Sequence, residues 1–250
     1  APLVGHLVDR AKKGSQFLQN FDSVEPKRYW IPADAVSRVL DLGLELAGRD
    51  SPDLPLLRAC VFLALQFAWF CRSDTGTSAC NRDVTLLDDI TLVAVKQKGR
   101  RHEKWKPVYR IPKDAIQGLF KLLTKWKAWQ KKWKLAGPSE SFWRLPTEGP
   151  HTKSFSASKH GTAWTRLALA AVGAEPPPDF KFDGHGSRSG AATGASAVGV
   201  NLTRICFMAN WSIRSAVVHD YIDPTAPATP GAFRFFGWLV PSLSNGKILG

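Results

Sequence analysis

The sequence has few methionines, tyrosines and acidic residues, and it has no long apolar run. Its 250 residues include one Met and three Tyr, against ten Trp and fourteen Phe, so we expect a core built from large rigid rings. No stretch approaches the ~18 consecutive apolar residues of a membrane-spanning helix, and no basic-then-apolar leader opens the chain. We therefore expect neither membrane insertion nor classical secretion.

Neither the cysteines nor any common nucleotide-binding motif indicates a metal or a cofactor. Four cysteines are present, and none forms a Cys-x-x-Cys or stands beside a His pair at zinc-ligand spacing. We expect free thiols in the reducing interior of a cell. The P-loop, the dinucleotide fingerprint, the nucleophile elbow and the zinc-protease signature are absent. The sequence thus predicts no bound metal and no cofactor.

Positive charge is abundant, and it is concentrated in one region. The net charge is +13, and the 39 residues from Lys96 to Lys134 contain fourteen Lys or Arg against two acidic residues. Such a stretch is either a solvated face or a surface that attracts polyanions. Its density favours double-stranded DNA as the partner, with contacts that set affinity and salt dependence more than sequence choice. The predicted DNA-contacting residues are Lys96, Arg100, Arg101, Lys104, Lys106, Lys125, Lys131 and Lys132.

The hydrophobic pattern predicts a mainly α fold with a small antiparallel β-sheet. An amphipathic helix begins near Pro32, and the very apolar stretch 54–72 reads as a central buried helix ending at Arg72. Alternating short patterns at 84–87, 90–95 and 106–111 predict the sheet. Further helices are expected at 8–18, from Pro112 onward, and at 156–172, 187–198, 202–208 and 212–219. The helix at 187–198 consists almost entirely of Gly, Ala, Ser and Thr, so we expect it deep in the packing or against a ligand.

One group of residues in the second half of the chain carries chemistry. Gly184-His185-Gly186-Ser187-Arg188 opens the small-residue helix, and Trp211 and Tyr221 follow. A His and an Arg three residues apart share one helix face and can hold one group together. Each residue alone has an ordinary structural explanation: a helix-end anchor for Tyr221, a core position for Trp211. Together and in this order, the pattern resembles the catalytic domain of tyrosine recombinases, the family of phage integrases, Cre and Xer proteins.

The resemblance covers roughly residues 28–224 and implies a role for each matching position. Arg72 and Arg188 would hold the phosphate, His185 would handle a proton, Trp211 would donate its indole N–H, and Tyr221 would be the nucleophile. The family's catalytic lysine lies in a β-hairpin; here we prefer Lys98, beside a glycine, with Lys96 as the alternative.

The implied activity is DNA cleavage and rejoining through a 3′-phosphotyrosyl intermediate, without ATP or metal. Implied partners are double-stranded DNA and further copies of the chain, as a dimer or tetramer. The resemblance also implies an intracellular location, which would be the nucleus in a eukaryote. It further implies an origin in a mobile element, with eukaryotic elements of the DIRS or Crypton type as candidates. Competing interpretations are a type IB topoisomerase, a hairpin telomere resolvase, and an inactive DNA-binding relative.

Three departures from the family pattern concern the flanks of the site. The gap from Trp211 to Tyr221 is one residue longer than usual, and Thr75 stands where an acidic residue is expected, with Asp74 one place earlier. Residues 1–27 are too few for the family's DNA-clamping domain, so we interpret them as a linker or remnant. We interpret the Pro- and aromatic-rich residues 225–250 as a tail that docks either on a neighbouring protomer or on its own domain.

Overall fold

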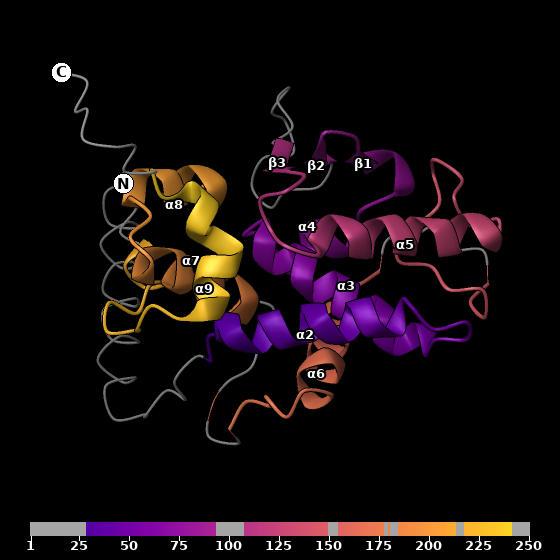
Figure 1. Cartoon of the computed structure of the whole chain (residues 1–250), viewed down its shortest axis with the longest axis horizontal. Coiled ribbons are helices and arrows are strands. Elements are labelled where there is room, and N and C mark those ends of the chain that lie inside the picture. Colours follow the sequence, from indigo (N-terminus) through magenta and orange to yellow (C-terminus); the bar gives the residue numbers. More distant parts are fainter. Residues whose placement is uncertain are drawn as a thin grey trace, which may run out of the picture.

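The computed structural model describes residues 29–93, 108–149, 155–177, 180, 185–213 and 218–241. Within them the chain is mainly helical, with one three-stranded antiparallel sheet (Figure 1). This confirms the predicted fold class. The helix expected at 8–18 lies outside the described residues. Among the described helices, none combines the length and the hydropathy that crossing a membrane requires.

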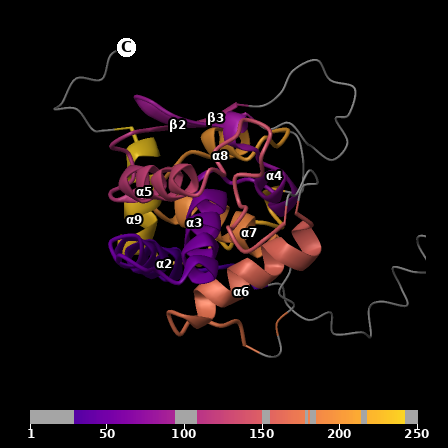
Figure 2. The ribbon, with the colours of Figure 1, turned by 90° about the vertical axis from the view of Figure 1, so that its right-hand side faces the viewer.

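Helix α3 (Leu54–Ala68) forms the centre of the molecule. Every residue from Leu57 to Ala68 is buried, as expected from the apolar run. Around it pack α2 (Ala33–Leu46), α5 (Leu119–Lys132), α6 (Thr162–Ala170) and α7 (Gly186–Ala197), an arrangement visible end-on in Figure 2.

Helix α3 ends earlier than the sequence predicts. Trp69 caps it, and Phe70 adopts a left-handed backbone with φ 52°. This reverses the chain and starts the short helix α4 (Ser73–Thr77), whose N-cap is Arg72. Arg72 therefore lies at a turn between two helices and not on the last turn of α3.

The sheet comprises β1 (Val84–Leu86), β2 (Asp89–Val93) and β3 (Val108–Pro112) in the order β1-β2-β3. A 3-10 turn at Asn81–Asp83 precedes it. Strand β3 alternates between buried and exposed residues, so Tyr109 and Ile111 point into the core. The connection between β2 and β3, with its six predicted site residues, lies outside the described residues.

Helix α5 begins later than predicted, at Leu119 and not near Pro112. Residues 113–118 form turns that end at Gly118, whose φ of 90° is left-handed. Because this conformation cannot belong to a right-handed helix, it sets the start of α5. A π-helical turn (Ala157–Gly161) leads into α6.

Helix α7 lies deep in the packing because its residues are small. The chain segment before α2 crosses it directly: the Ile31 amide donates to the Gly186 carbonyl at 3.1 Å. A Cβ on Gly190 would overlap the carbonyl oxygen of Ile31, so this crossing requires glycine. After α7 come α8 (Leu202–Met208) and the segment that bears Tyr221.

The C-terminal segment adds a helix that the sequence analysis did not predict, α9 (Pro230–Phe236), followed by a 3-10 turn (Gly237–Leu239). It packs on α2 and α7 of its own chain, and an Arg234–Asp41 ion pair of 2.8 Å holds it there. In this structure the packed body thus continues beyond residue 224. Docking of a tail on a neighbouring protomer stays a prediction, and residues 242–250 lie outside the described part.

Candidate active site

Arg188 lies on the first turn of α7 with its side chain almost fully enclosed, 3% exposed. Its Nη2 donates a hydrogen bond to the Ala209 carbonyl at the end of α8, and its guanidinium stacks over the Trp211 ring with Cζ 4.7 Å from the centroid. A hydrogen bond and a cation–π contact together fix the direction of the guanidinium.

Two guanidinium charges act on one another in this place. Burial, and then the charge of Arg72, lowers the pKa of Arg188 to about 10, against smaller opposite effects of Tyr109, Tyr221 and Cys71. Arg188 therefore remains cationic at neutral pH. Its Nε is buried and finds no hydrogen-bond partner within the described part of the chain. No ion pair with Arg72 or Arg188 occurs among the described residues, and a buried cation with an unpartnered donor is costly unless an anion joins it.

Arg72 is placed by the turn between α3 and α4. Its carbonyl accepts from the Gly76 amide at 3.0 Å in the first turn of α4. The next residue, Ser73, is buried and receives a 2.6 Å hydrogen bond from Gln66 of α3. The half-buried Arg72 is thus held close to the central helix through its neighbour Ser73.

The hydroxyl of Tyr221 forms a hydrogen bond with the imidazole of His185. Tyr221 Oη lies 2.9 Å from His185 Nδ1, and the tautomer of the imidazole decides which atom donates. The Tyr221 ring packs on Trp211, with 4.9 Å between centroids, and Trp211 in turn lies against Arg188. Four predicted residues therefore form one continuous group, and Arg72 acts on it through its charge.

Thr193 is a residue of this region that the sequence analysis missed. From the middle of α7, its hydroxyl donates to the Tyr221 carbonyl at 3.3 Å and accepts from the Asp223 amide at 3.1 Å. In the sequence Thr193 is one of many small residues in α7. The signal that could have indicated a role is a hydroxyl group in a helix that was expected to be buried. Tyr109 was also missed; it is buried on β3 and acts electrostatically on Arg188.

The predicted DNA-contacting residues fall into two sets. Lys125, Lys131 and Lys132 lie on α5, where Lys125 is half-buried and donates to the Ala47 carbonyl at 3.4 Å, while the other two are exposed. The remaining members lie in the connection between β2 and β3, outside the described residues, as do both candidates for the catalytic lysine: Lys96, Lys98, Arg100, Arg101, Lys104 and Lys106.

The residues beside Arg72 at which the family pattern departs have local structural roles. The carboxylate of Asp74 accepts from the Thr75 amide at 2.9 Å at the start of α4.

No group of three or more His, Cys, Asp or Glu suited to a metal ion occurs among the described residues.

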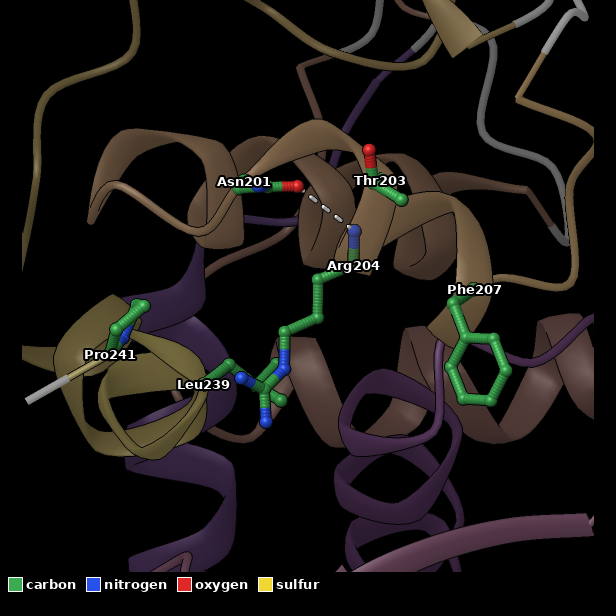
Figure 3. A pocket seen from close by; sticks show the side chains of 6 residues that line it. All are labelled: Asn201, Thr203, Arg204, Phe207, Leu239 and Pro241. Carbon is green, nitrogen blue, oxygen red and sulfur yellow. Dashed lines mark hydrogen bonds between the residues drawn. The ribbon is translucent and has the colours of Figure 1, made fainter. Parts of the chain in front are cut away.

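A separate open hollow of about 460 Å³ lies between α8 and the C-terminal turn. Figure 3 shows the Arg204 side chain extending from α8 toward Leu239 across this hollow, with Phe207 at its edge. Phe207 is 83% exposed, and the apolar side chains of Leu202 and Ile213 are exposed as well. These exposed apolar side chains lie on α8 and in the segment that follows it.

Comparison with known proteins identifies the fold. No family model and no curated protein matches the chain. Among solved structures, the XerH site-specific recombinase bound to its difH substrate matches with a TM-score of 0.55 and 10% identity, over 80% of this chain and 51% of that one. A lambda integrase(75–356) dimer bound to a COC′ core site matches with a TM-score of 0.50 and 15% identity, over 82% and 62%.

A lambda integrase tetramer bound to a Holliday junction matches similarly, with a TM-score of 0.50 and 13% identity. The chain spans about half the length of XerH and of this integrase. At such identities the likeness concerns the backbone arrangement. The chain has the fold of tyrosine recombinase catalytic domains.

Proposed function

We propose that this chain cleaves and rejoins DNA strands by transesterification, with Tyr221 as the nucleophile. The observation that carries the proposal is the 2.9 Å contact between Tyr221 Oη and His185 Nδ1, next to the buried guanidinium of Arg188. A nucleophile beside a base, with fixed positive charge at the same place, is the arrangement that phosphoryl transfer requires. The proposal is also supported by the fold and by the DNA bound in the matching structures of XerH and lambda integrase.

The proposed reaction begins when a DNA phosphodiester binds to the two arginines. Each guanidinium can give paired hydrogen bonds to the non-bridging oxygens, whose charge grows in the transition state. The buried Arg188 Nε and the mutual repulsion of Arg72 and Arg188 favour entry of an anion. Trp211 contacts both the Arg188 guanidinium and the Tyr221 ring, so a phosphate bound at Arg188 would lie near the nucleophile.

In the chemical step, the Tyr221 oxygen forms a bond to phosphorus and the bond to the 5′-oxygen breaks. A tyrosine hydroxyl ordinarily ionises near pH ~10, so its proton must leave during the attack. His185 is the group within reach to accept it. The departing 5′-oxygen needs a proton, for which we propose Lys98, with Lys96 as the alternative. The 3′-phosphotyrosyl bond retains the energy of the broken bond, so a 5′-hydroxyl can reverse the step.

We further propose that the chain acts as a dimer or tetramer on DNA, in the recombination of a mobile element. The structures it resembles include a dimer and a tetramer on DNA. In this chain the proposal is supported by Phe207, a large apolar side chain of α8 that is 83% exposed. Phe207→Glu should lower the number of protomers per DNA molecule without weakening the first binding step, as mass photometry can measure.

A covalent trap tests the chemistry. The probe is a pool of 5′-labelled, nicked duplexes made from random sequence, in which a short fragment leaves after cleavage and religation fails. The wild-type chain should transfer label to protein, and Tyr221→Phe should transfer none while it binds the pool equally well in a filter assay. Sequencing of the trapped strands would then give the target site.

The outcomes separate the competing functions. Label transfer without sequence preference, with relaxation of supercoiled DNA, would identify a topoisomerase; closed hairpin products would identify a telomere resolvase. Salt-sensitive binding with no covalent adduct under any condition would mean that the chain is a DNA-binding protein without this activity.

A further inference from the structure

The polypeptide that carries Tyr221 is attached to α7 through one buried hydroxyl. Thr193 is 1% exposed, and its Oγ1 lies 3.3 Å from the Tyr221 carbonyl oxygen and 3.1 Å from the Asp223 amide nitrogen. The hydroxyl donates to the first group and accepts from the second, so its hydrogen and one of its lone pairs both bind residues 221–223.

The position of Thr193 on α7 gives this attachment a chemical meaning. His185, the N-cap of the same helix, contacts the Tyr221 hydroxyl, and Arg188 in its first turn provides the buried cation. Thr193 holds the backbone of Tyr221 from the next turns of that helix. One rigid element therefore fixes the tyrosine at both ends, at its main chain and at its phenolic oxygen.

Beyond Asp223 the chain is held by a local turn. The carboxylate of Asp223 accepts from the Thr225 amide at 2.9 Å and from its hydroxyl at 2.7 Å, both at an exposed position. These bonds shape the turn but connect it to no helix. The link through Thr193 is thus a direct polar connection between the tyrosine segment and the body of the protein.

We propose that Thr193 is a positioning residue, which sets the distance from the Tyr221 oxygen to the phosphate by holding the backbone of residues 221–223. The inference rests on the proposed function. A nucleophile displaced by about 1 Å reacts on the order of 10²-fold more slowly. Loss of the hydroxyl should therefore reduce the rate of the covalent step, while the surfaces that bind DNA are unchanged.

The test compares Thr193→Val, which keeps the shape and removes both hydrogen bonds, with Thr193→Ser, which keeps the hydroxyl. Single-turnover transfer of label from the nicked duplex pool should fall by about 10- to 100-fold in Thr193→Val and by less than about threefold in Thr193→Ser. DNA affinity should match that of the wild type in both. Rates are compared at a temperature at which melting curves show every variant folded, and Thr193→Ala serves as the second hydroxyl-free variant.

A modified leaving group distinguishes positioning from acid catalysis. In a substrate with sulfur in place of the 5′-bridging oxygen, the departing thiol needs little help from an acid, because thiols ionise near pH ~8.5. This substrate should restore the rate of a variant without its proton donor, Lys98→Ala or Lys96→Ala. It should not restore Thr193→Val, since the position of the attacking oxygen is still wrong.

The inference and the proposed function fail in different ways. If the wild type forms no adduct, the proposed function is lost. If the wild type forms an adduct and both hydroxyl-free variants react at its rate, or if the sulfur substrate restores them fully, Thr193 has no positioning role.

Discussion

The two halves of the candidate active site are held in different ways. The arginine half is anchored in the core: Arg188 is 3% exposed and packed on Trp211, and half-buried Arg72 lies in the turn between the buried helix α3 and α4. The tyrosine half lies at the surface, where half-buried Tyr221 is followed by an exposed turn. It is connected to the body by polar contacts from Thr193 and His185 and by the packing of the Tyr221 ring on Trp211.

This difference suggests a division of tasks. Folding itself fixes the Arg188 guanidinium, because any displacement of it would disturb close-packed neighbours. Tyr221, the proposed nucleophile, is placed largely by a few hydrogen bonds, each worth about 1 kcal/mol in net stability. Small changes can therefore alter the reactivity of the tyrosine while the fold and the cation site persist.

The largest expected effect comes from removing the cations. Arg72→Ala and Arg188→Ala should each lower the rate of adduct formation by on the order of 10²- to 10³-fold, the usual cost of one fixed donor in the transition state. Arg188→Ala should also lower the melting temperature, because it leaves the Ala209 carbonyl without its donor and Trp211 without its stacking partner. Arg204→Ala, at an exposed arginine of α8, is the control. If Arg188→Ala melted at the same temperature as the wild type and Arg204→Ala, the packing around Arg188 would not be what fixes the arginine half.

A smaller effect, on stability alone, tests the rigidity of the arginine half. Gly190→Ala places a Cβ against the Ile31 carbonyl where α7 and the incoming chain cross. Such crowding typically costs about 1–3 kcal/mol of unfolding free energy, which denaturant titration can measure. Gly149→Ala, at an exposed position with no atom within 4 Å of the added Cβ, is the matched control. Identical unfolding curves for the two variants would show that the backbone at this crossing shifts to accommodate the added Cβ without a measurable loss of stability.

The smallest effect is expected at the exposed turn after the tyrosine. Hydrogen bonds from Thr225, followed by a weaker one from Trp30, lower the pKa of the Asp223 carboxyl below its usual value. Because the folded-state pKa is depressed, the contribution to stability is present above the usual value near pH ~4 and is lost as the pH falls through the folded-state value. Water screens this exposed group strongly.

Asp223→Ala should therefore change the cleavage rate by at most a few-fold, and its difference in melting temperature from the wild type should shrink between pH 5 and pH 3. Asp223→Asn, which keeps an acceptor, is the comparison. A loss of rate as large as that of Thr193→Val would mean that the turn, and not α7, positions the tyrosine.

The sequence predicted the buried half of this site better than the exposed half. The apolar run of α3 and the small residues of α7 have strong patterns, and both helices lie where those patterns indicate. Helix α9 was missed because Pro and Gly suggested a loop; Thr229 as N-cap, with Pro230 after it, was the available signal. The early end of α3 at Phe70 could not be predicted, since a left-handed phenylalanine has no local sequence signature.

The return of α9 to the body has a practical consequence for anyone who shortens this chain. Phe235 and Phe236 contact Phe67 and Phe70, the aromatic residues at the end of α3 just before Arg72, and Phe236 also lies near Gly194 of α7. A version cut after residue 224 would expose the rings of Phe67 and Phe70 to solvent and remove packing from the segments that carry Arg72 and Arg188. Aggregation or inactivity of such a fragment would report a damaged interior, and would say nothing about exchange of segments between protomers.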